Sequence, residues 1–133
     1  MNKNKWALIT GASSGLGLDF SDILAKRGMN LVVVARREDR LLELKEKLER
    51  LYRIKNIKVE VIAADLSAVS ASKNLADEID KREIQIEVLI NNAGFGLYGD
   101  FVDSDMKQVT QMLNLDIVAL TELTHIYAQK MRV

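Results

Sequence analysis

Thr10-Gly11-Ala12-Ser13-Ser14-Gly15-Leu16-Gly17 is a glycine-rich segment that separates two different hydrophobic patterns. Residues 6–9 before it form an apolar run typical of a short buried strand, and residues 18–27 after it show helical spacing. The first turn of a helix has unpaired backbone N–H groups and partial positive charge, and glycines let a phosphate approach those groups closely. The order of strand, glycine turn and helix therefore favours nucleotide binding over an ordinary tight turn.

Composition limits the classes of protein that the chain can belong to. Its 133 residues, 48% of them hydrophobic, suit one globular domain spanning residues 1–133. Nineteen basic residues balance nineteen acidic ones, so no nucleic-acid or membrane partner is expected. The lack of cysteine excludes disulfides and thiolate chemistry, and a single histidine argues against a metal site. No apolar run approaches the roughly 18 residues of a membrane span, and we expect a cytoplasmic protein.

Strand and helix patterns alternate along the rest of the chain. Further strands are predicted at 31–35, 59–64 and 86–90, and helices at 39–51, around Leu75 and Ile79, and from about 104 to 131. This alternation predicts an α/β fold with right-handed βαβ units and a doubly wound parallel sheet. The expected strand order is 3-2-1-4, with the ligand bound beyond the carboxyl ends of the strands.

Apolar stripes predict the inward faces of the helices. The first helix carries such residues at helical spacing, namely Leu16, Phe20, Ile23 and Leu24. The leucines of the second helix, at 41, 44, 48 and 51, fit a helix on a sheet better than a coiled coil, because the repeat is short. The inward stripe of the long last helix is predicted to be Met106, Val109, Leu113, Ile117, Leu120, Thr124, Tyr127 and Met131.

Polar residues follow each predicted strand. Arg36 stands where an acidic residue would bind the ribose 2′-hydroxyl of NAD, and a basic residue there can pair with a 2′-phosphate, which favours NADP. Arg37 either shares this role or faces solvent. Asp65 is either an acceptor for the adenine amino group or a helix N-cap. The predicted cofactor-binding residues are Gly11, Ser13, Ser14, Gly15, Leu16, Gly17, Arg36, Arg37, Asp65, Leu66, Asn91, Asn92, Ala93 and Gly94.

Taken in order, the glycine turn, Arg36, Asp65-Leu66 and Asn91-Asn92-Ala93-Gly94 resemble the N-terminal half of a short-chain dehydrogenase/reductase. The resemblance covers essentially all 133 residues. It implies a Rossmann fold and hydride transfer between NADP(H) and a small carbonyl or alcohol substrate. It also implies a homo-oligomer, commonly built through the long fourth and fifth helices.

The chain departs from the family in its catalytic residues. The family uses a Ser and a Tyr-x-x-x-Lys, but the residues four places after Tyr52, Tyr98 and Tyr127 are Asn, Val and Met. The family's catalytic asparagine corresponds to Asp116, because spacing and helical phase favour this position over Asn114. An ionised aspartate accepts hydrogen bonds and donates none.

These departures lead to two expectations. The chain stops before the family's fifth strand and is expected to be inactive in hydride transfer by itself, with a non-catalytic nucleotide-binding or interaction module as the alternative function. The missing strand leaves apolar residues 88–90 on an open sheet edge, so an oligomer is expected.

Overall fold

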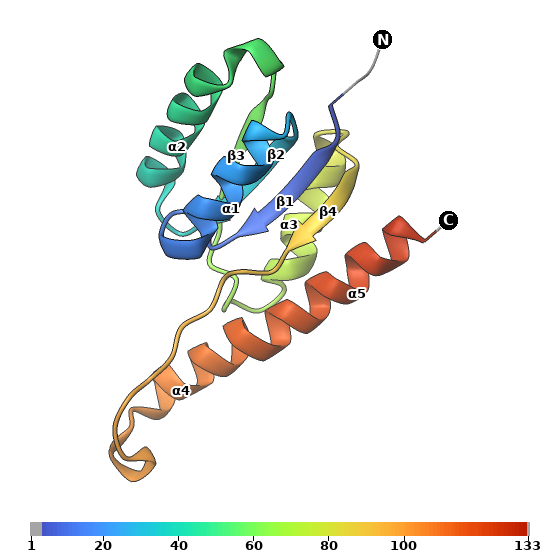
Figure 1. The fold of residues 1–133 in the computed structure, drawn as a ribbon. Coiled ribbons are helices and arrows are strands. Elements are labelled where there is room, and N and C mark those ends of the chain that lie inside the picture. Colours follow the sequence, from blue (N-terminus) through green and yellow to red (C-terminus); the bar gives the residue numbers. More distant parts are fainter. Residues whose placement is uncertain (1–3, 133) are drawn as a thin grey trace.

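The computed structural model describes residues 4–132, which form one parallel sheet with helices on both faces (Figure 1). The strands are β1 (Trp6–Thr10), β2 (Asn30–Ala35), β3 (Val59–Ala63) and β4 (Ile86–Ile90). The main helices are α1 (Gly15–Lys26), α2 (Glu38–Leu51), α3 (Ala71–Lys81), α4 (Met106–Leu113) and α5 (Leu120–Met131). Short 3₁₀ turns lie at Arg53–Lys55 and Phe101–Asp103, and a π-helical turn at Asn114–Ala119 joins α4 to α5.

The strand order is β3-β2-β1-β4, which confirms the prediction. All three strand pairs are parallel, and Ala7 of β1 is aligned with Leu31 of β2 and with Val88 of β4. The side chains of residues 31–34 are completely buried because helices cover both faces of β2. The carboxyl ends of all four strands therefore lie along one edge of the sheet, where the polar strand-end residues gather.

Two apolar clusters fill the space between the sheet and its helices. One cluster joins alternate strand residues such as Ile9 and Val33 to α1 and α2, and it includes Leu41, Leu44 and Leu48. The other joins the opposite faces of the same strands to α3 and α5. Among residues 4–132, no helix is both long enough and apolar enough to cross a bilayer.

The predicted inward stripe of α1 is wrong for three of its four residues, since only Leu24 packs against the core. Leu16, Phe20 and Ile23 are 65%, 36% and 47% exposed, and the buried residues of this helix are Gly17, Ser21 and Ala25. Small side chains let the helix backbone lie close to β1 and β2, so the small residues rather than the large ones face the sheet.

The stripe predicted for the last helix is also partly wrong. Val109 and Tyr127 are buried as expected, but Met106, Leu113, Ile117, Leu120 and Thr124 are exposed. The π-helical turn at Asn114–Ala119 adds residues to one turn and shifts the helical phase after it. As a result Ala119 and Leu123 face inward. A uniform 3.6-residue spacing instead predicts inward positions for the next residues, Leu120 and Thr124.

Candidate functional site

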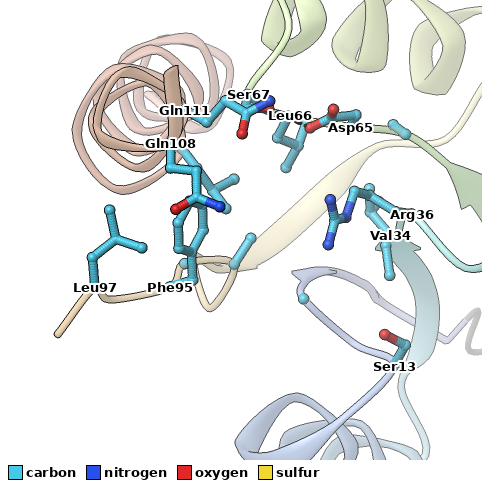
Figure 2. Close-up of a pocket in the computed structure, with 16 residues that line it drawn as sticks. Ser13, Val34, Arg36, Asp65, Leu66, Ser67, Phe95, Leu97, Gln108 and Gln111 are labelled. Atoms are coloured by element: carbon cyan, nitrogen blue, oxygen red, sulfur yellow. Dashed lines mark hydrogen bonds between the residues drawn. The ribbon is translucent and has the colours of Figure 1, made fainter. Parts of the chain in front are cut away.

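A cleft of about 470 Å³ opens at the carboxyl ends of the strands (Figure 2). It is lined from all four strand ends and from α4, and the predicted site residues among its walls are Gly11, Ser13, Arg36, Asp65, Leu66, Ala93 and Gly94. The predicted residues Ser14, Gly15, Leu16, Gly17, Arg37, Asn91, Asn92 and Asp116 do not line this cleft. The sheet thus brings seven of the fifteen predicted site residues to one cavity.

The glycine turn needs its glycines for two reasons. Gly11 and Gly15 have φ angles of +63° and +54°, a left-handed conformation that side chains other than glycine rarely adopt. A Cβ atom on Gly17 would overlap the carbonyl oxygen of Gly11, so the start of α1 can lie against the turn only without a side chain. Ser14 occupies the N-cap position of α1 but makes no side-chain cap hydrogen bond. The opening of α1 can therefore offer its backbone N–H groups to an anion.

Thr10 ties the glycine turn to the loop that follows β4. Its buried Oγ1 accepts hydrogen bonds from the backbone N–H groups of Asn92 and Ala93, each at 3.0 Å. In return, Asn92 Nδ2 donates to the carbonyl oxygen of Gly11 at 3.1 Å. Asn92 therefore acts through the glycine turn, and Thr10 is a supporting residue that sequence reasoning included in the turn without giving it this role.

The two arginines after β2 have different surroundings. Arg36 lines the cleft, and Figure 2 shows its guanidinium directed into it. Arg37 instead donates from Nε and Nη2 to the carboxylate of Asp39, at 3.2 and 2.7 Å. This hydrogen bonding raises the pKa of Arg37 and lowers the pKa of Asp39. Arg36 is thus the arginine placed to meet an anion in the cleft.

Asp65 follows the end of β3 by two residues and lines the same side of the cleft as Arg36 (Figure 2). Its Oδ1 accepts from the backbone N–H of Ser67 at 3.0 Å and from the Ser67 hydroxyl at 2.6 Å. These hydrogen bonds, with a smaller contribution from the charge of Arg36, hold the pKa of Asp65 below its usual value. The N-cap alternative is wrong, because α3 begins at Ala71 and its N-cap residue is Ser70. Asp65 is an ionised acceptor at the mouth of the cleft.

Asn91 and Asp116 hold the loop after β4 against the last helices. Asn91 Nδ2 donates to Thr124 Oγ1 at 2.9 Å, and Asp116 Oδ1 accepts from the backbone N–H of Phe95 at 3.0 Å. A Cβ atom on Gly94 would lie 2.9 Å from the same Asp116 oxygen, so the close approach depends on glycine there. The carboxylate of Asp116 therefore positions the wall of the cleft from the π-helical turn.

The far wall of the cleft contains residues that sequence reasoning missed. They are Phe95, Leu97, Gln108, Gln111 and Leu115, from the loop after β4 and from α4 and the π-helical turn (Figure 2). No spacing signal pointed to Phe95 and Leu97, because the loop after β4 has no regular hydrophobic pattern. The two glutamines supply amide groups that can donate and accept hydrogen bonds at this wall. No group of three His, Cys, Asp or Glu side chains within residues 4–132 is arranged to hold a metal ion.

A parallel sheet in this order, with a glycine turn opening α1 and a cleft at the strand ends, defines an α/β protein with a Rossmann-type fold. The family model described as short chain dehydrogenase matches residues 5–132. This chain belongs to that family.

Curated relatives and solved structures agree with this assignment. The chain is 34% identical over 130 residues to a very-long-chain 3-oxoacyl-CoA reductase of Meyerozyma guilliermondii, a match that covers 96% of this chain and 37% of the relative. It is 34% identical over 122 residues to the oxidoreductase YmfI of Bacillus subtilis, covering 91% of this chain and 48% of that protein.

Solved structures of short-chain dehydrogenases and related enzymes have the same fold as this chain. The short-chain dehydrogenase of Sphingobium yanoikuyae in complex with NADPH is similar with a TM-score of 0.82 and 37% identity, over 95% of this chain and 48% of that one. The bulky-bulky ketone specific alcohol dehydrogenase of Comamonas testosteroni has a TM-score of 0.85 and 33% identity, over 97% of this chain and 50% of that one. The chain thus spans about half, or less, of the length of these relatives.

Proposed function

We propose that this chain is the cofactor-binding half of an NADP(H)-dependent short-chain oxidoreductase, which exchanges hydride between NADP(H) and a small carbonyl or alcohol compound. The observation that carries the proposal is the position of Arg36. Its guanidinium lies in the cleft, and Asp39 forms its hydrogen bonds with Arg37 instead. A guanidinium matches the geometry of a phosphate, so Arg36 pairs with the 2′-phosphate that distinguishes NADP from NAD. The complex of the Sphingobium yanoikuyae enzyme with NADPH supports the same choice of cofactor.

Other residues of the cleft suit the remaining parts of the cofactor. The opening of α1, with Gly11 and Ser13 beside it, receives the pyrophosphate through backbone N–H groups. Asp65 accepts a hydrogen bond from the adenine amino group, since its low pKa keeps it ionised at neutral pH. Leu66 and Ala93 supply apolar surface for the adenine ring. When bound, the cofactor would supply the hydride, and the groups named here hold and orient it.

Replacement of Arg36 tests the cofactor preference. Arg36→Ala is expected to weaken NADPH binding by about 30-fold, equivalent to a charge-assisted hydrogen-bond contribution of about 2 kcal/mol, while NADH binding changes little. Isothermal titration calorimetry with each cofactor measures both effects. The matched control is Arg37→Ala, which removes the neighbouring positive charge that already pairs with Asp39. This variant should lower the affinity for NADPH much less. Equal losses for NADPH and NADH in Arg36→Ala would remove Arg36 from the 2′-phosphate role.

A second expectation concerns turnover. The sequence has no Tyr-x-x-x-Lys, so the chain lacks the group that would pass a proton to or from the substrate oxygen. We expect the purified chain to bind NADPH without oxidising it in the presence of aldehydes and ketones, as followed by the absorbance of NADPH. Oxidation above the rate without protein would show that another residue supplies the proton.

A further inference from the structure

Asp65 keeps one carboxylate oxygen open to a ligand in the cleft. Both hydrogen bonds that it accepts from Ser67 end on Oδ1, one from the backbone N–H and one from the hydroxyl. Within residues 4–132, the other oxygen, Oδ2, takes part in no hydrogen bond. Because Asp65 lines the cleft, Oδ2 is an acceptor that a bound molecule can use.

Gln111 lies on the wall that α4 contributes to the same cleft. Gln111 and Leu115 are four residues apart and both line the cleft, so they share one face of the helix. Figure 2 shows the Gln111 amide directed towards the side of the cleft where Leu66 and Asp65 lie. The amide is exposed, so it can meet a ligand without displacing a neighbouring side chain.

Apolar packing fixes this face of α4 relative to the end of β3. Leu66 is buried in the cluster between the sheet, α3 and α5, and Leu115 packs against that cluster. The two leucines line both the cleft and the small space behind it. Asp65 directly precedes Leu66, and Gln111 lies one helical turn before Leu115. The packing therefore holds the carboxylate and the amide on either side of the same part of the cleft.

An ionised carboxylate and a primary amide recognise different groups of a ligand. The carboxylate only accepts hydrogen bonds, whereas the amide offers two N–H donors as well as a carbonyl acceptor. One edge of an adenine base presents the N6 amino group, which donates, beside the ring nitrogen N1, which accepts. This edge therefore suits a cleft with an acceptor on one wall and a donor on the other.

We propose that Gln111 is a specificity-determining residue for the base of the cofactor, and that it donates from Nε2 to adenine N1 while Asp65 Oδ2 accepts from N6. This contact rests on the proposed function, since it requires a nucleotide cofactor in the cleft. Of the two ring nitrogens that flank the amino group, N1 is farther from the ribose than N7. Gln111 likewise lies across the cleft from Ser13 and the glycine turn, which is the proposed phosphate site (Figure 2).

The hypoxanthine analogue of NADPH tests the base contact on the full 133-residue chain. In this analogue a carbonyl oxygen replaces the amino group and N1 carries a hydrogen, so the donor and the acceptor of the edge are exchanged. The unmodified chain should bind NADPH at least about tenfold more tightly than the analogue, because Asp65 would face a carbonyl oxygen in place of a donor. Calorimetric titration with each compound measures the two affinities.

Gln111→Glu should reverse the contribution of this residue. Its carboxylate would face the lone pair of adenine N1 and lower NADPH affinity by about tenfold, but it can accept from the N1–H of hypoxanthine. The preference for NADPH over the analogue should therefore narrow by about tenfold or more. The matched control is Gln108→Glu, which adds the same charge one turn earlier on α4, where the amide is directed towards Phe95 (Figure 2). This control should lower both affinities by the same factor.

The outcomes separate this base contact from the proposed function. An equal loss of both affinities in Gln111→Glu, as in Gln108→Glu, would show that Gln111 does not contact the base and would leave NADPH binding intact as a function. An unmodified chain that binds NADPH and the analogue equally would overturn both base contacts. No binding of NADPH by the unmodified chain would contradict the proposed function, and the base contact with it. Both glutamines are exposed, so circular dichroism should show the same fold in both variants.

Discussion

Gly17→Ala is expected to lower the free energy of unfolding by about 3 kcal/mol and to abolish detectable NADPH binding. The new Cβ atom would overlap the carbonyl oxygen of Gly11 and lie 2.8 Å from Asn92 Nδ2. Alanine favours a helix over glycine by about 1 kcal/mol, but this gain is smaller than the cost of moving the backbone of the glycine turn. Because that turn and the start of α1 form the predicted phosphate site, the same movement should remove cofactor binding.

Gly96→Ala is the matched control. Nothing lies within 4 Å of a Cβ atom on Gly96, and its φ angle is not in the left-handed region. Urea unfolding followed by circular dichroism, with calorimetric titration of NADPH, compares the two variants. A Gly17→Ala chain as stable as the wild type would contradict the close approach of α1 to the turn.

Thr10→Val should have the next largest effect, a loss of about 2 kcal/mol in the free energy of unfolding. Valine keeps the shape of threonine in the buried end of β1, but it leaves the N–H groups of Asn92 and Ala93 without their acceptor. The loop after β4 would also lose its fixed position beside Gly11, so NADPH affinity should fall as well. Thr10→Ser restores the hydroxyl and should recover most of the cofactor affinity. If Val and Ser variants were equally affected, the methyl group rather than the hydroxyl would be the important part of Thr10.

The sequence predicted the sheet well because buried parallel strands leave a simple signal. Residues 31–35 form an uninterrupted apolar run, and the run agrees with a strand covered on both faces. The polar residues that follow the strands were placed at one edge by the strand order alone. Seven of the fourteen predicted cofactor-binding residues do line the cleft, as this topology requires.

Helix orientation was harder to predict, for reasons visible in particular residues. In α1, the large apolar side chains are exposed, while the small residues Gly17, Ser21 and Ala25 face the sheet. In the last helix, the π-helical turn changes the helical phase, and no proline or glycine within Asn114–Ala119 indicates its position in the sequence. Arg36 lines the cleft, whereas Arg37 pairs with Asp39. The sequence shows only two adjacent arginines and does not indicate which of them forms this pair.

The measurement that bears most directly on the central claim is the affinity of the unmodified chain for NADPH and for NADH, determined by calorimetric titration under identical conditions. The chain is proposed to hold NADP(H) through the glycine turn, Asp65 and Arg36, so NADPH should bind at least about tenfold more tightly than NADH. Equal affinities, a preference for NADH, or no binding of either cofactor would contradict the account.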